Sequence, residues 1–104
     1  MAIITSNDTS FDEDLKKNEK VVVKYYADWC GSCKLFSPKY KRLSDDERFR
    51  DISFLDVNAE HNPGARKMAN VDTLPFFAVF RNGVLVEAKS TTKEDDFIAL
   101  LEKL

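Results

Sequence analysis

The stretch Trp29–Lys34, which reads WCGSCK, decides how this chain folds. It follows the run Val21–Ala27, which is β-branched or aromatic at most positions and is therefore typical of a central strand covered on both faces. A helix is expected next, from about Ser32 to Glu47. Cys30 and Cys33 are thus placed where a strand ends and a helix begins, which is where chemistry collects in open α/β sheets.

The spacing of the two cysteines suits thiol–disulfide exchange. Cys30, at the N-terminal end of the expected helix, faces unpaired backbone N–H groups and the positive end of the helix dipole, and both favour the nucleophilic thiolate. Cys33 follows three residues later on the same helix face, so it can reach Cys30. The predicted chemistry has two steps: Cys30 attacks a substrate disulfide, and Cys33 resolves the mixed disulfide that forms.

Two other interpretations of the cysteine pair have less support. A structural zinc site takes about four protein ligands, whereas the chain has two cysteines and one histidine, His61, which is expected on a solvated loop. A metal shared across a dimer is the form of this interpretation that stays open. The other interpretation is a pair of inert thiols, and the polar, turn-like Gly31-Ser32 between them argues against it. No metal site is predicted.

The remainder of the chain alternates strand-like and helix-like segments, which predicts an α/β fold with a sheet flanked by helices. Further strands are expected at Ala2–Thr5, Ile52–Val57, Phe76–Arg81 and Val84–Ala88, and further helices at 10–17, 62–70 and from 91 onward.

Local signals mark the ends of these segments. Ser10 and Thr91 each precede a glutamate by three residues and match a capping box. Asn62-Pro63 is typical of an N-cap followed by proline at the first helical position. Asn82-Gly83, between two apolar runs, is a strong hairpin signal. Because no repeat or linker interrupts this series, a single domain over residues 1–104 is predicted.

Composition and charge narrow the function classes. Hydrophobic residues make up 43% of the chain, enough for a packed core without disulfide staples. The formal charge of −2 excludes a strongly basic nucleic-acid-binding domain, and no apolar run is long enough to span a membrane. The segment Met1–Asp8 lacks the basic and apolar regions of an export signal. We therefore expect a cytoplasmic protein, and nothing in the sequence demands more than a monomer.

Taken in order, these features resemble the thioredoxin family over nearly the whole chain. The family's Trp-Cys-Gly-x-Cys-Lys motif corresponds to Trp29–Lys34, and its helix proline, five residues past the second cysteine, corresponds to Pro38. Its Asn-Pro-Gly helix start corresponds to Asn62–Gly64, its proline facing the cysteines to Pro75, and its Asn-Gly hairpin to Asn82-Gly83. The resemblance implies a thioredoxin fold, with a central mixed β-sheet flanked by helices on both faces.

The resemblance also implies a function and a set of substrate-binding residues. The bond between Leu74 and Pro75 is expected to be cis, with the backbone of Leu74 pairing with extended substrate. Trp29 is expected to shield the site, and Gly31 and Ser32 complete the substrate-binding surface. The family implies a thiol-disulfide oxidoreductase that reduces protein disulfides and receives electrons from a thioredoxin-reductase-type donor. Its redox group is the cysteine pair itself, and no bound cofactor is expected.

The chain departs from the family most sharply in a buried charge pair. Thioredoxins typically carry an aspartate six residues before the first cysteine and a lysine on the neighbouring strand, whereas these positions here are Lys24 and Asp56. One hypothesis is that Lys24 lowers the pKa of a cysteine by stabilising its thiolate, while Asp56, or a neutral Lys24, accepts the proton. The alternative is a partly wet ion pair without a catalytic part. The sequence leaves both open.

Three smaller departures bear on function. Gly31-Ser32 stands where Gly-Pro is usual, which leaves an additional N–H donor near Cys30. The segment Glu87–Thr92 lacks the family's groove glycine, and Phe76, interpreted as a core residue, follows the proline where threonine is common. These changes keep two alternatives open: a redox-inactive binding subunit or chaperone-like adaptor, and a disulfide oxidant or isomerase, which only the redox potential distinguishes.

Overall fold

A five-stranded mixed sheet forms the centre of the molecule. The computed structural model describes residues 3–104, and its strands lie in the order β1-β3-β2-β4-β5. The strands β1, β2 and β3 run parallel, whereas β4 and β5 run antiparallel to their neighbours. The predicted mixed sheet is therefore confirmed, with β2 in the middle. Their bounds are Ile4–Thr5 (β1), Lys20–Tyr26 (β2), Ser53–Asn58 (β3), Phe76–Arg81 (β4) and Val84–Ser90 (β5).

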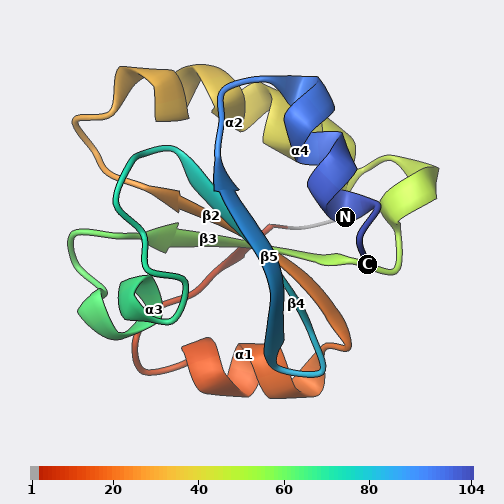
Figure 1. Ribbon diagram of the computed structural model, residues 1–104, viewed down its shortest axis with the longest axis horizontal. Helices are drawn as coiled ribbons and strands as arrows, with labels where there is room; N and C mark the ends of the chain where they lie inside the picture. The colour runs from red at the N-terminus through yellow and green to blue at the C-terminus, as the bar shows by residue number, and fades with distance from the viewer. Residues whose placement is uncertain (1–2) are drawn as a thin grey trace.

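Helices cover both faces of the sheet, as the resemblance implies. The helices α2 (Gly31–Ser44) and α4 (Glu94–Leu101) lie on one face, and α1 (Phe11–Lys17) and α3 (Pro63–Lys67) lie on the other (Figure 1). Within residues 3–104, no helix is long and apolar enough to cross a membrane.

The two helical layers enclose two hydrophobic cores that share the sheet. Alternate residues of β2 point to opposite faces, so Val21, Val23 and Tyr25 pack toward α1 and α3, whereas Val22 packs toward α2 and α4. Because both faces of β2 are covered, its side chains from Val21 to Tyr25 are all buried. The position on this strand that breaks the apolar pattern is Lys24, whose side chain lies on the α2 face near the active-site end.

Several element ends differ from the predictions. The helix that follows the cysteines ends at Ser44 rather than Glu47, because a 3-10 turn at Glu47–Phe49 follows it. The helix α3 ends at Lys67 rather than near Asn70, which has a positive φ of 52°. A strand is present at Ile4–Thr5, and the predicted start of that strand at Ala2 lies outside the described residues.

The two predicted capping boxes do not form. Ser10 occupies the N-cap position of α1 without a side-chain cap, and its hydroxyl instead accepts a hydrogen bond from the backbone N–H of Asn7. The N-cap of α4 is Lys93 rather than Thr91. The hydroxyl of Thr91 donates to the carboxylate of Asp96, so the side chain is engaged three residues before the helix begins.

The predicted N-cap position of Asn62, with Pro63 at the start of the helix, is confirmed, although the Asn62 side chain does not cap the helix. Asn62 holds the N-cap position of α3, but its side-chain oxygen accepts from the backbone N–H of Asp8, and its side-chain N–H donates to the carbonyl of Asn58. The carboxylate of Asp8 takes over the capping and accepts from the backbone N–H groups of Gly64 and Ala65, at 3.0 and 2.8 Å. A residue more than fifty positions away thus caps α3.

Two backbone predictions are confirmed. Asn82 and Gly83 both have positive φ, 52° and 80°, as the two central residues of a type I′ hairpin require. The peptide bond between Leu74 and Pro75 is cis. This bond lies directly before β4, which begins at Phe76.

Candidate active site

The two cysteines form a disulfide at the carboxyl end of the central strand. Cys30 and Cys33 are bonded, with their Cα atoms 5.3 Å apart, and both are almost fully buried. A short turn after β2 carries the chain to Cys30, which is the N-cap residue of α2. The predicted pairing and its place between strand and helix are confirmed.

The start of α2 presents donors to the sulfur of Cys30. The backbone N–H of Cys33 donates to Cys30 Sγ at 3.2 Å, and the hydroxyl oxygen of Ser32 lies 3.5 Å from the same atom. The first turn of α2 carries no acidic residue that would oppose a negative charge. Hydrogen bonds to a thiolate and the positive helix end both lower a cysteine pKa, so this environment favours the reactive form of Cys30 once the disulfide is reduced.

The rim around the disulfide combines exposed and buried residues. Trp29 precedes Cys30 in the chain and is 68% exposed, and Gly31 is exposed between the cysteines. Leu74 is half-buried and packs against the small cluster formed by Ala27 and the two cysteines. Pro75 is buried, and its carbonyl accepts a hydrogen bond from the hydroxyl of Ser90. Of the two predicted neighbours, Leu74 therefore contacts the cysteine cluster, and Pro75 follows it directly in the chain.

Lys24 and Asp56 form an ion pair below the first turns of α2. They are direct register partners on β2 and β3, and Lys24 Nζ lies 3.4 Å from Asp56 Oδ1. The side chain of Lys24 is 3% exposed and that of Asp56 is 25% exposed, so one member of the pair is dry and the other meets solvent. The ammonium also lies 4.9 Å from the centre of the Tyr40 ring, a favourable position for a cation.

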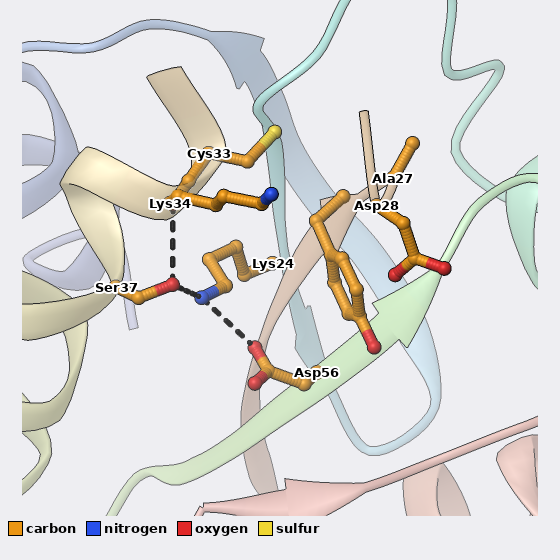
Figure 2. A pocket seen from close by; sticks show the side chains of 8 residues that line it. Lys24, Ala27, Asp28, Cys33, Lys34, Ser37 and Asp56 are labelled. Carbon is orange, nitrogen blue, oxygen red and sulfur yellow. Dashed lines mark hydrogen bonds and ion pairs between the residues drawn. The ribbon is translucent and has the colours of Figure 1, made fainter. Parts of the chain in front are cut away.

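Burial raises the pKa of Asp56 above the ordinary aspartate value, even though the charge of Lys24 acts to lower it. The buried Oδ1 atom of Asp56 has no hydrogen-bond partner among the described residues, because its contact with Lys24 has the distance but not the geometry of a hydrogen bond. Both side chains line a cavity of about 150 Å³ that also reaches Cys33 (Figure 2). Asp56 is thus a partly hydrated carboxylate with elevated proton affinity beside the second cysteine.

Ser37 is a site residue that the sequence analysis missed. Its hydroxyl accepts a hydrogen bond from Lys24 Nζ at 2.8 Å and donates to the backbone carbonyl of Cys33 at 3.2 Å (Figure 2). The signal in the sequence is a serine four residues after Cys33, a spacing at which a hydroxyl can reach back to a helix carbonyl. That signal does not reveal the lysine on the other side.

The remaining predictions about individual side chains have clear outcomes. Phe76 is buried and packs edge-to-face against Tyr25, which confirms that it is a core residue. His61 is exposed on the loop that precedes α3, as predicted. Across residues 3–104, no group of three or more His, Cys, Asp or Glu side chains could hold a metal ion.

Comparison with known proteins identifies the family. The Thioredoxin family model matches residues 2–103. Among curated relatives, Thioredoxin 1 of Plasmodium falciparum is 28% identical over 99% of this chain and 97% of its own length. A protein disulfide-isomerase of Medicago sativa is 32% identical over 97% of this chain, which spans only 21% of that larger protein.

Solved structures agree with the sequence comparison. A chain in the crystal structure of a complex of ferredoxin:thioredoxin reductase and thioredoxin f2 superposes with a TM-score of 0.87 and 27% identity, covering 96% of this chain and 92% of that one. The likeness extends over the sheet, both helical layers and the cysteine-bearing turn. With Cys30–Cys33 as its CxxC redox centre, the chain belongs to the thioredoxin family of thiol-disulfide oxidoreductases.

Proposed function

We propose that this protein reduces disulfide bonds in other proteins, with Cys30 as the nucleophile and Cys33 as the resolving cysteine. The observation that carries the proposal is the position of Cys30 at the N-terminus of α2, where a backbone N–H already points at its sulfur. Cys33 follows within the first turn of α2. An attacking thiolate must reach the substrate, so the residue at the helix start is the better nucleophile.

The reaction transfers two electrons from the dithiol to the substrate. The Cys30 thiolate attacks one sulfur of a substrate disulfide, that bond breaks, and the first substrate thiolate leaves and takes up a proton. The Cys33 thiol then loses its proton and attacks Cys30 Sγ. The mixed disulfide breaks, the second substrate thiol is released, and the Cys30–Cys33 disulfide is formed.

Asp56 and Lys24 have different roles in the proposed reaction. Asp56 accepts the proton of Cys33, because its carboxylate borders the same cavity, has a buried oxygen without a hydrogen-bond partner among the described residues, and has a pKa that burial raises above the ordinary aspartate value. Lys24 stabilises the negative charge of the cysteine thiolate. Its ammonium remains well accommodated when Asp56 is protonated, because Ser37 and the Tyr40 ring provide further stabilising contacts.

The substrate surface and partners follow from the family. Trp29, Gly31, Ser32, Leu74 and Pro75 surround the disulfide and bind the extended substrate segment. An external reductase of the thioredoxin-reductase type restores the dithiol, since the disulfide is the redox group and the family implies no bound cofactor. The similarity to a chain solved in complex with ferredoxin:thioredoxin reductase supports such a partner. We further propose a cytoplasmic monomer in which residues 1–104 act as one domain.

Trapping of the mixed disulfide tests the order of the two cysteines. A Cys33→Ser variant should accumulate a covalent complex with a disulfide-bonded substrate protein, whereas the matched Cys30→Ser variant should not. Dithiothreitol should reduce the mixed disulfide and separate the two proteins. Equal trapping by both variants would contradict the assigned order of the two cysteines, and trapping by Cys30→Ser alone would reverse it. A double serine variant with full biological activity would instead favour a redox-inactive binding subunit.

The equilibrium redox potential tests the direction of electron flow. A value near −270 mV, about that of thioredoxin, supports a disulfide reductase. A value between about −180 and −120 mV would instead assign the protein as an isomerase or oxidant.

A further inference from the structure

Ser37 connects the buried ammonium of Lys24 to the helix that carries both cysteines. Lys24 Nζ and Ser37 Oγ are 2.8 Å apart, and Ser37 Oγ and the carbonyl oxygen of Cys33 are 3.2 Å apart (Figure 2). An ammonium has only donors, so the serine oxygen must accept from Lys24. The single hydroxyl proton is then directed at the Cys33 carbonyl. The direction of both hydrogen bonds is therefore determined by chemistry.

The serine holds the ammonium on the helix side of its ion pair. Ser37 lies on α2 and Asp56 on β3, and Lys24 Nζ sits between them (Figure 2). The contact with Ser37 is a hydrogen bond, whereas the 3.4 Å contact with Asp56 lacks that geometry. A lysine stem is flexible. Without the serine hydroxyl, the ammonium would turn toward Asp56 and away from the cysteines.

We propose that Ser37 is a positioning residue that keeps the Lys24 ammonium beneath the first turn of α2 and thereby sets how strongly this charge stabilises the Cys33 thiolate. The inference rests on the proposed role of Lys24 in thiolate stabilisation and adds a residue to which no role has been assigned. Ser37 acts through Lys24 and does not itself touch the reacting sulfur atoms.

Several charged and titratable groups face this region, and all of them remain when Ser37 alone is changed. Any effect specific to the serine hydroxyl therefore reports the position of the ammonium rather than the loss of a charge. These groups are Lys24 and Tyr26 from β2, Asp28 from the following loop, Lys34 and Tyr40 from α2, and Asp56 from β3.

The test compares threonine and valine at position 37 in the reduced full-length protein. The two side chains have the same shape and both are β-branched, but only threonine keeps the hydroxyl. The titration of each cysteine is followed by carbon NMR of its Cβ, and the redox potential provides a second readout. Ser37→Val should raise the pKa of Cys33 by about half a unit, as expected when a charge retreats by one or two ångströms in a partly buried site. Ser37→Thr should keep the wild-type titration.

A double-variant comparison separates this inference from a simple helix effect. In the Lys24→Met background, Ser37→Val should have no further effect on the cysteine titration, because the charge that the serine positions is gone. A shift that persists in that background, or a Ser37→Val titration like that of Ser37→Thr, would overturn the inference. An unchanged titration in Lys24→Met itself would overturn both the role of Lys24 and the inference, while the trapping experiment would still decide the reductase function independently.

Ser37→Ala guards against a folding artefact. If the valine variant is not folded, the smaller alanine variant is measured against Ser37→Thr in the same way. An alanine variant that folds and titrates like wild type would overturn the inference.

Discussion

At the scale of single residues, a buried lysine lies beside the active site, at a position where the resemblance to thioredoxins leads us to expect an aspartate. A buried ammonium is costly unless its charge is compensated. Here Lys24 has a hydroxyl from Ser37, a carboxylate from Asp56 and the face of Tyr40 around it. In the proposed mechanism Asp56 binds the proton, and its side chain is the more exposed member of the pair. In this arrangement Lys24 provides a fixed positive charge, and Asp56 provides the carboxylate that titrates.

Replacing Asp56 by asparagine should slow the resolving step. The variant removes the proton acceptor while keeping the shape of the side chain. We expect the rate constant for release of reduced substrate to fall by about tenfold at neutral pH. This effect is smaller than the typical effect of a general base, because a thiol can also transfer its proton to water. Single-turnover kinetics with a pre-formed mixed disulfide measures this step. An unchanged rate would remove Asp56 from the mechanism.

The same residue should leave a signature in the stability of the oxidised protein. Burial raises the pKa of Asp56 above 3.8, so the folded state binds this proton more tightly than the unfolded state. The resulting stabilisation is complete below the unfolded pKa and is lost as the pH rises through the folded pKa. The free energy of unfolding of wild type minus that of Asp56→Asn should therefore decrease as the pH rises above about 4. Urea titrations across this range measure the difference, and a constant difference would contradict the assigned pKa direction.

At the scale of secondary-structure elements, the short helix α3 depends on a distant residue. The five-residue helix cannot be stable alone. Two of its first backbone N–H groups are satisfied by the carboxylate of Asp8, which precedes α1. Through its backbone N–H, Asp8 also bonds to Asn62 at the start of the helix. This three-way contact joins the N-terminal segment to the loop between β3 and β4.

Replacing Asp8 by alanine should cost about 1 kcal/mol of stability, the usual value for the loss of a helix cap. Urea unfolding monitored by circular dichroism measures this change. The matched control is Thr9→Ala, because Thr9 is the exposed neighbour of Asp8 in the same turn, and its effect should stay within about 0.5 kcal/mol. Equal losses in both variants would indicate that Asp8 does not act as a cap.

At the scale of the whole molecule, an aromatic cluster joins the helices α2 and α4 to the sheet. The ring of Phe97 on α4 lies within 4.8 to 6.3 Å, between ring centres, of four other rings. These neighbours come from α2, β3 and β4. The cluster lies directly beyond the Lys24 site, since Tyr40 belongs to both. Packing in this core therefore supports the position of the active-site helix.

Replacing Phe97 by alanine should destabilise the protein by about 3–5 kcal/mol, because a large ring leaves a cavity that the surrounding rings cannot fill. A domain of this size has a total stability of about 5–15 kcal/mol, so the variant should lose a substantial part of its stability. Thermal and urea unfolding measure the loss. The control Leu35→Ala, at a 78% exposed position of α2, should change stability by less than about 0.5 kcal/mol. A loss below about 1 kcal/mol for Phe97→Ala would refute a central role for the cluster.

The sequence by itself determined the features that depend on neighbouring residues. The β-branched run before the cysteines, the CxxC turn, the Asn82-Gly83 hairpin and the order of the elements all follow from local periodicity and backbone preference. The resemblance to the thioredoxin family implied the cis bond before Pro75 and the pairing of Lys24 with Asp56, and both are present. In the site, the sequence predicted the pairing of the two cysteines, and the resemblance implied the place of Leu74, which packs against them.

Only the tertiary structure decided which distant side chains share a partner. Asp8 rather than Asn62 caps α3. The hydroxyl of Ser37 accepts a hydrogen bond from Lys24, a contact that the sequence did not predict. The local capping motifs failed because a serine, threonine or asparagine side chain forms whichever hydrogen bond the fold brings within reach. Such contacts join residues that the sequence separates by many positions, and the packing of helices on the sheet sets the distance between them.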